Sequence, residues 1–153
     1  MRNKYLSFFV ILISTFSASV IGSFVTNLYK EPWYSQLILP TFNPPSWVFA
    51  PVWSTLYFFM SVAAWRVWNG NNNKKILTIY FIHLFFNAIW SVIFFGFHNI
   101  GLAMINLIII ISFIFVLLNL YKKNDKISYF LMLPYLLWSS YALLLNFSIF
   151  VLN

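Results

Sequence analysis

Indole, phenol and carboxamide side chains recur at helical spacing in three apolar segments, and these groups have the clearest capacity for specific binding. They include Trp53 and Tyr57 in one segment, Asn87 and Trp90 in a second, and Trp138 and Asn146 in a third, with Ser91 and Ala142 at the same helical spacing. Aromatic faces stack on flat apolar molecules, and an amide in an apolar setting must find a hydrogen-bond partner. The pattern therefore predicts a pocket for a flat hydrophobic ligand.

The residues needed for ordinary catalysis are scarce. The absence of cysteine excludes disulfides, thiolate catalysis and cysteine-based metal sites. The two acidic residues, Glu31 and Asp125, fall in predicted loops, so no carboxylate pair can form inside a membrane. His83 is expected to be a hydrogen-bonded core histidine rather than a haem ligand, because no second ligand is evident. We predict no catalytic residues, no metal site and no required cofactor.

Composition indicates the medium in which this chain folds. Of its 153 residues, 62% are hydrophobic and only 7% are charged, whereas a typical soluble domain has roughly 25% charged residues. Apolar runs of about 20 residues, long enough to cross a bilayer, fill most of the length. We predict an all-α, polytopic membrane protein whose single domain, residues 1–153, is a bundle of five transmembrane helices.

Short polar stretches and one long loop separate the five apolar segments. The predicted helices are residues 5–27, 47–68, 75–97, 100–121 and 127–152. The first run could be mistaken for a signal peptide, but its length favours a retained helix. The long loop, residues 28–46, is rich in proline, which fixes its own φ and biases the preceding residue toward extended shapes. This loop is expected to be a structured lid over a pocket.

The formal net charge of +7 follows membrane topology rather than nucleic-acid binding. The predicted N-terminal side of the membrane carries Arg2, Lys4, Arg66, Lys74, Lys75, Lys122, Lys123 and Lys126. The long loop carries only Lys30. Because basic residues favour the cytoplasmic side, we predict a cytoplasmic N-terminus, with the long loop and the C-terminus on the opposite side. No nucleic-acid partner is expected.

Helical geometry places the candidate residues at comparable depths. At about 1.5 Å per residue, Trp53 and Asn146 lie roughly 9 Å from the long-loop side, Asn87 roughly 15 Å and Trp138 roughly 20 Å. The second, third and fifth helices would then share a cavity in one half of the bilayer. Two other interpretations stay open: tryptophans also face lipid, and Asn87 and Asn146 also fit hydrogen bonds between neighbouring helices.

Five ordered motifs, spread over nearly the whole chain, carry a family resemblance. They are Pro32–Tyr34, Asn43–Trp53, Ala63–Trp65, Asn87–Ser91 and Leu133–Trp138. In these motifs the chain resembles the TspO/MBR family of tryptophan-rich sensory proteins, which includes the translocator proteins, or peripheral benzodiazepine receptors. The resemblance implies a five-helix bundle, often dimeric, that binds porphyrins such as protoporphyrin IX and haem and, in many members, benzodiazepine-type ligands.

The resemblance also assigns ligand-binding positions beneath the long loop. It places Tyr34 and Pro44 in the lid, Trp53 and Tyr57 on the second helix, Asn87, Trp90 and Ser91 on the third, and Trp138 and Ala142 on the fifth. Some bacterial relatives are reported to break down porphyrin in light, and the matching tryptophans are Trp53 and Trp138. Two alternatives to a porphyrin receptor or carrier therefore stay open: light- and oxygen-dependent porphyrin degradation, and a regulatory membrane partner without ligand turnover.

The fifth predicted helix departs from the sterol-recognition pattern of the animal members. No lysine or arginine follows Tyr141 before the chain ends at Asn153. Such motifs are weak even when complete, so the sequence does not favour cholesterol as a ligand. The expected partners are a porphyrin or other hydrophobic small molecule, membrane lipid, and a second copy of the chain in a homodimer.

Overall fold

The computed structural model describes residues 3–71 and 73–153, so that Arg2 of the predicted topology signal lies outside the described residues. The long helices are α1 (Lys4–Tyr29), α2 (Ser46–Asn71), α3 (Lys74–Ser91), α4 (Ile100–Asn124) and α5 (Lys126–Leu152). A π-helical turn, η2 (Val92–Gly96), extends α3, and a 3₁₀ turn, η1 (Tyr34–Gln36), interrupts the long loop. When η2 is counted as the end of the third helix, the predicted helix ends differ from these bounds by at most three residues.

Within the described ranges, five helical segments are long and apolar enough to cross a membrane, and no strand is present. Large apolar side chains on several helices are at least half exposed, among them Phe9, Phe24, Phe85, Phe115 and Phe147. Side chains of this kind require a lipid environment rather than water. The prediction of an all-α, multi-pass membrane bundle is confirmed.

Short polar side chains set the start of four helices. The side-chain oxygens of Asn3, Asn73, Asn99 and Asp125 accept hydrogen bonds of 2.9–3.2 Å from backbone N–H groups in the first turn of α1, α3, α4 and α5. Such caps satisfy donors that lack a partner within the helix. The polar breaks between the apolar runs therefore also define where each helix begins.

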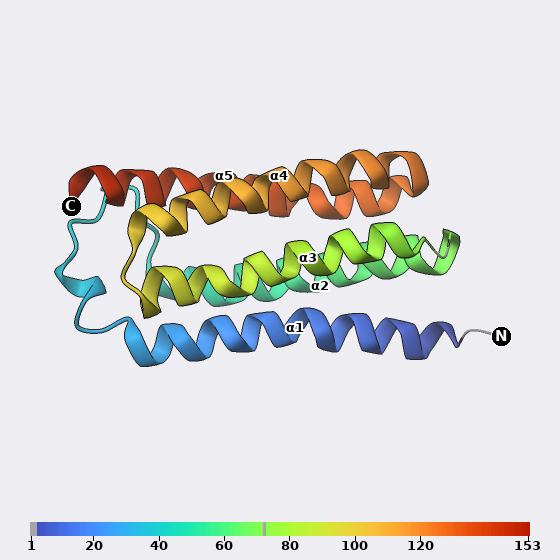
Figure 1. Ribbon diagram of the computed structural model, residues 1–153, viewed down its shortest axis with the longest axis horizontal. Helices are drawn as coiled ribbons and strands as arrows, with labels where there is room; N and C mark the ends of the chain where they lie inside the picture. Colours follow the sequence, from blue (N-terminus) through green and yellow to red (C-terminus); the bar gives the residue numbers. More distant parts are fainter. Residues whose placement is uncertain (1–2, 72) are drawn as a thin grey trace.

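The helices form a closed ring around the long axis. α1 packs on α2 and α3, α5 packs on α2 and α4, and α3 packs on α4. The long loop, the α3–α4 connection and the C-terminus lie at one end, here called the loop end (Figure 1). The N-terminus and the α2–α3 and α4–α5 turns lie at the other end, here called the basic end because it carries Lys4, Lys74 and Lys122.

The two halves of the bundle are packed differently. The half toward the basic end is filled by large, fully buried side chains, including Met60, Tyr80, Ile114, Tyr121 and Tyr135. In the half toward the loop end, the helices surround a cavity instead. The filled half therefore supplies a rigid base from which the helices project toward the long loop.

The long loop is fixed to the C-terminal part of α5. The amide of Asn153 accepts from Ile38 N–H at 2.9 Å and donates to Ile38 C=O at 3.1 Å. Nearer the cavity, the Tyr141 hydroxyl donates to the backbone C=O of Phe42 at 2.7 Å. These contacts hold the loop across the end of the bundle as an ordered structure.

Candidate functional site

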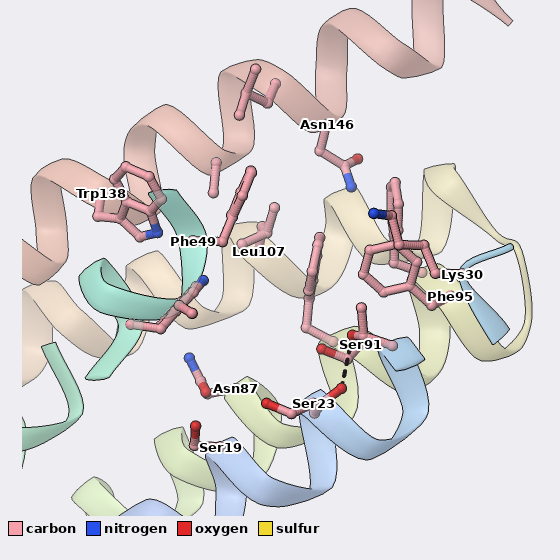
Figure 2. A pocket seen from close by; sticks show the side chains of 18 of the residues that line it. Ser19, Ser23, Lys30, Phe49, Asn87, Ser91, Phe95, Leu107, Trp138 and Asn146 are labelled. Atoms are coloured by element: carbon pink, nitrogen blue, oxygen red, sulfur yellow. Dashed lines mark hydrogen bonds between the residues drawn. The ribbon is translucent and has the colours of Figure 1, made fainter. Parts of the chain in front are cut away.

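A cavity of about 520 Å³ lies in the loop-end half of the bundle. Side chains from all five helices and from the long loop line it (Figure 2). Pockets for small organic ligands commonly have volumes of about 300–1,000 Å³. The cavity therefore has the size of a ligand-binding site.

Nine of the ten residues predicted from the sequence line this one cavity. They are Tyr34, Trp53, Tyr57, Asn87, Trp90, Ser91, Trp138, Ala142 and Asn146. Pro44 is not among the lining residues: it is half-buried just before α2, beside Asn43, which does line the cavity. The walls of α2, α3 and α5 thus converge as their helical spacing predicted.

Aromatic rings form much of the cavity wall. The ring of Trp53 lies 5.5 Å from that of Tyr57 along α2, and Trp90 stacks on Phe94 at 5.0 Å between centroids. On α5, Trp138 packs edge-on against Phe49 of α2, with 5.9 Å between the ring centroids. Three indoles from three helices therefore line one cavity.

The deepest polar groups of the cavity are bonded to one another. The Tyr57 hydroxyl donates to Asn87 Oδ1 at 2.5 Å, and Asn87 Nδ2 donates to the Tyr135 hydroxyl at 2.8 Å. That hydroxyl lies 2.8 Å from His83 Nε2. Because Tyr135 already accepts from Asn87, its own proton is available to His83. His83 is a hydrogen-bonded core residue, as predicted, and does not line the cavity.

Polar atoms nearer the loop end lack such partners. Both amide atoms of Asn146 and the indole Nε1 of Trp90 are buried without a hydrogen-bond partner among the described residues. Asn146 is only 2% exposed. In Figure 2 its side chain extends from α5 into the cavity. These atoms lack a partner in the described protein, so a polar group that reaches them would satisfy them.

Sequence reasoning missed the wall that α1 contributes. This wall consists of Ser19, Gly22, Ser23, Thr26 and Asn27. The signal in the sequence is a polar stripe, Ser19, Ser23 and Thr26, at positions i, i+4 and i+7 of an otherwise apolar helix. It contains no tryptophan or amide. A Cβ added to Gly22 would lie 3.1 Å from the Ser91 hydroxyl oxygen, so glycine permits the close approach of α1 and α3 that closes this side.

Lys30, the basic residue of the long loop, also lines the cavity. Its Nζ lies 3.8 Å from a Glu31 carboxylate oxygen and 5.1 Å from the centre of the Tyr34 ring. Burial raises the pKa of the Tyr34 phenol above its usual value, so that this lid residue is neutral at physiological pH. The loop end of the cavity therefore combines a cation with neutral polar groups.

Among residues 3–71 and 73–153, no group of three or more histidine, cysteine, aspartate or glutamate side chains is placed to hold a metal ion. The lining instead offers indole faces, amides, hydroxyls and one ammonium group. Such a set is suited to binding and orienting an amphipathic molecule.

Comparison with known proteins places the chain in a family. Residues 9–152 match the family model described as the TspO/MBR family. The chain is 32% identical over 144 residues to a tryptophan-rich protein TspO of Archaeoglobus fulgidus, covering 93% of this chain and 94% of the relative. It is 34% identical to a tryptophan-rich sensory protein of Cereibacter sphaeroides, over 93% and 91% of the two chains. It is 31% identical to the human translocator protein, over 86% and 83%. The chain belongs to the TspO/MBR family of integral membrane proteins.

Proposed function

We propose that this protein is a membrane receptor or carrier for porphyrins, with protoporphyrin IX or haem as the ligand, in a translocator or sensory role. The observation that carries the proposal is the cavity itself, where Trp53, Trp90 and Trp138 surround one space beneath an ordered loop. Indole faces provide the stacking surfaces that a flat macrocycle needs. The lid and the polar groups near it are suited to the carboxylates at the edge of such a ligand.

The orientation in the membrane is part of the same proposal. Most described lysine residues lie at the basic end of the bundle, and Lys30 lies at the loop end. Because basic residues favour the cytoplasm, the cavity opens on the non-cytoplasmic side. Exposed apolar helix faces supply a surface for a homodimer or for lipid. The missing basic residue after Tyr141 argues against cholesterol.

Titration of purified protein with protoporphyrin IX tests the proposal, with the dissociation constant taken from the midpoint of tryptophan quenching. Removing an indole from the wall, in Trp53→Ala or Trp138→Ala, is expected to weaken binding about tenfold, since each loses stacking and buried apolar area. Trp47→Ala is the matched control, because Trp47 is 75% exposed and does not line the cavity. Equal midpoints for the wild type and both cavity variants would refute this binding site.

A second function, light-dependent breakdown of the bound porphyrin, is favoured by the position of Trp53 and Trp138 in the lining of the same cavity. Dioxygen would be the oxidant, and the indoles would lie close to the excited ligand. Porphyrin absorbance should then fall only under light and air, and Trp138→Phe should slow the loss. Equal rates in darkness and in light would exclude this chemistry. If neither function holds, a regulatory role would leave cavity variants without phenotype.

A further inference from the structure

The polar lining of the cavity divides into a satisfied and an unsatisfied part. At the deep end, the Tyr57 hydroxyl and the Asn87 amide are engaged in a chain of side-chain hydrogen bonds that continues to Tyr135 and His83. Ser139 also lines this end, and its hydroxyl is the one buried polar atom there without a partner among the described lining residues. The deep end therefore leaves fewer polar atoms for a ligand to satisfy than the loop end.

The loop end of the cavity presents the opposite situation. Trp90 Nε1–H is a donor, and Asn146 supplies a donor and an acceptor, yet all three atoms are buried without a partner among the described residues. An unmatched buried polar group is costly, whereas a matched one costs little. Atoms of this kind in a cavity wall indicate where a polar part of a ligand binds.

Trp90 and Asn146 lie at the same level of the bundle, on different helices. Each precedes the end of its helical segment by six residues, which is about 9 Å. Trp90 also packs in the loop-end apolar cluster that contains Ile149, one turn beyond Asn146 on α5. The two side chains therefore form one part of the cavity, from opposite walls.

A cation completes this part of the cavity. Lys30 lines the same space, and Figure 2 shows its side chain and that of Asn146 at one end, with Asn87 and Ser19 at the other. The ammonium group of Lys30 has three donors. Its contact with Glu31, at 3.8 Å, is longer than a charge-assisted hydrogen bond, so the ammonium has donors to spare for a ligand.

We propose that Lys30, Trp90 and Asn146 form a carboxylate subsite that fixes the direction in which an amphipathic ligand enters the cavity. The ammonium, the indole N–H and the Asn146 amide N–H bind the carboxylate, and Asn146 Oδ1 accepts a further hydrogen bond from Lys30. The carboxylate edge of the ligand then faces the long loop, and its apolar edge faces Tyr57. This inference rests on the proposed function, because it assigns the ligand class and the ligand's orientation in the same cavity.

A matched pair of ligands tests the subsite: protoporphyrin IX, with two carboxyl groups, and its dimethyl ester, in which both are masked. The wild type is expected to prefer the free acid. Lys30→Met, Trp90→Phe and Asn146→Leu should each weaken binding of the acid about tenfold more than binding of the ester, because the ester has lost the charge that the subsite recognises. Comparing the acid-to-ester ratio of each variant with that of the wild type removes differences in partition into detergent.

Two controls make the result decisive. Lys74→Met removes a lysine at the basic end and should leave the ratio unchanged, and Lys30→Arg should keep the preference for the acid. Retained ester binding shows that a variant is folded. If both ligands bind the wild type but the three variants retain its ratio, the subsite is refuted and the proposed function survives. If neither ligand binds the wild type, the proposed function fails, and this inference fails with it.

Discussion

The two ends of the bundle hold their ion pairs in different ways. Toward the basic end, Arg66 makes a two-point ion pair with Asp125, at 2.8 and 3.1 Å. The same carboxylate accepts from the Ser128 hydroxyl at 2.6 Å, and that hydroxyl lies 3.0 Å from the backbone C=O of Ala63 on α2. Toward the loop end, Lys30 and Glu31 are only 3.8 Å apart and adjacent in sequence. One pair is built into the fold, and the other is loose.

The difference separates the part of the chain that holds the bundle together from the part that receives a ligand. Large side chains such as Tyr80 and Tyr121 fill the half toward the basic end, and the Arg66–Asp125 pair joins α2 to the start of α5 there. The half toward the loop end is hollow, and polar atoms of Trp90 and Asn146 in its lining have no partner among the described residues. We therefore expect substitutions near the basic end to affect stability, and substitutions near the loop end to affect binding.

The largest effect is expected from Asp125→Ala. This change removes the partner of Arg66 and the N-cap of α5 together, and should lower the free energy of unfolding by about 2 kcal/mol. The apparent melting temperature in detergent, followed by circular dichroism, should fall by roughly 5 °C. Glu31→Ala is the matched control and should change it by no more than about 1 °C. Equal shifts for both variants would remove the distinction between the two ends.

Acid should break the same ion pair without mutation. The hydrogen bond from Arg66 lowers the pKa of Asp125 to about 2, below its usual value near 4. Because the pKa in the folded state is the lower one, the stabilisation is fully present above pH 4 and is lost as the pH falls from 4 toward 2. The melting temperature of the wild type should fall over this window, and that of Asp125→Asn should fall less. Parallel curves for the two proteins would contradict this assignment.

A smaller contrast concerns the two ends of the cavity. Tyr135→Phe removes the hydroxyl that joins Asn87 to His83, and should cost about 1 kcal/mol because both groups lose a partner. Asn146→Leu replaces an amide without a described partner by a side chain of similar size, and should be neutral or slightly stabilising. Melting temperatures of the two variants, without ligand, test the comparison. A larger loss in Asn146→Leu than in Tyr135→Phe would mean that the loop-end amide serves the fold.

The sequence was sufficient to predict the features that depend on local pattern. Apolar runs between short polar breaks predicted the helices, and Asn99 and Asp125 mark both a break and a cap. Tryptophans and amides at spacings of three or four residues predicted the cavity walls of α2, α3 and α5. These signals are strong because a polar group deep in a membrane is costly unless it faces the bundle interior or a cavity where it can find a partner.

The α1 wall could not be predicted with the same reasoning. A serine or threonine in a membrane helix can satisfy its hydroxyl on the helix itself, and Thr26 does so by donating to the C=O of Gly22 at 2.8 Å. Its presence therefore says little about a neighbouring cavity.

The ion pair between Arg66 and Asp125 could not be predicted either, because the two residues are 59 positions apart in the chain. Which polar groups are paired and which are left for a ligand depends on how the helices are arranged.

The smallest predicted effect concerns the loose pair at the loop end. Glu31→Gln removes the carboxylate that shares the Lys30 ammonium, and should strengthen binding of protoporphyrin IX by about twofold, since an exposed ion pair is worth less than about 1 kcal/mol. Binding of the dimethyl ester should not change. In the background of Lys30→Met, the same substitution should have no effect on either ligand, because the group that Glu31 competes for is absent. Weaker acid binding in Glu31→Gln would show that Glu31 holds Lys30 in place for the ligand instead of competing with it.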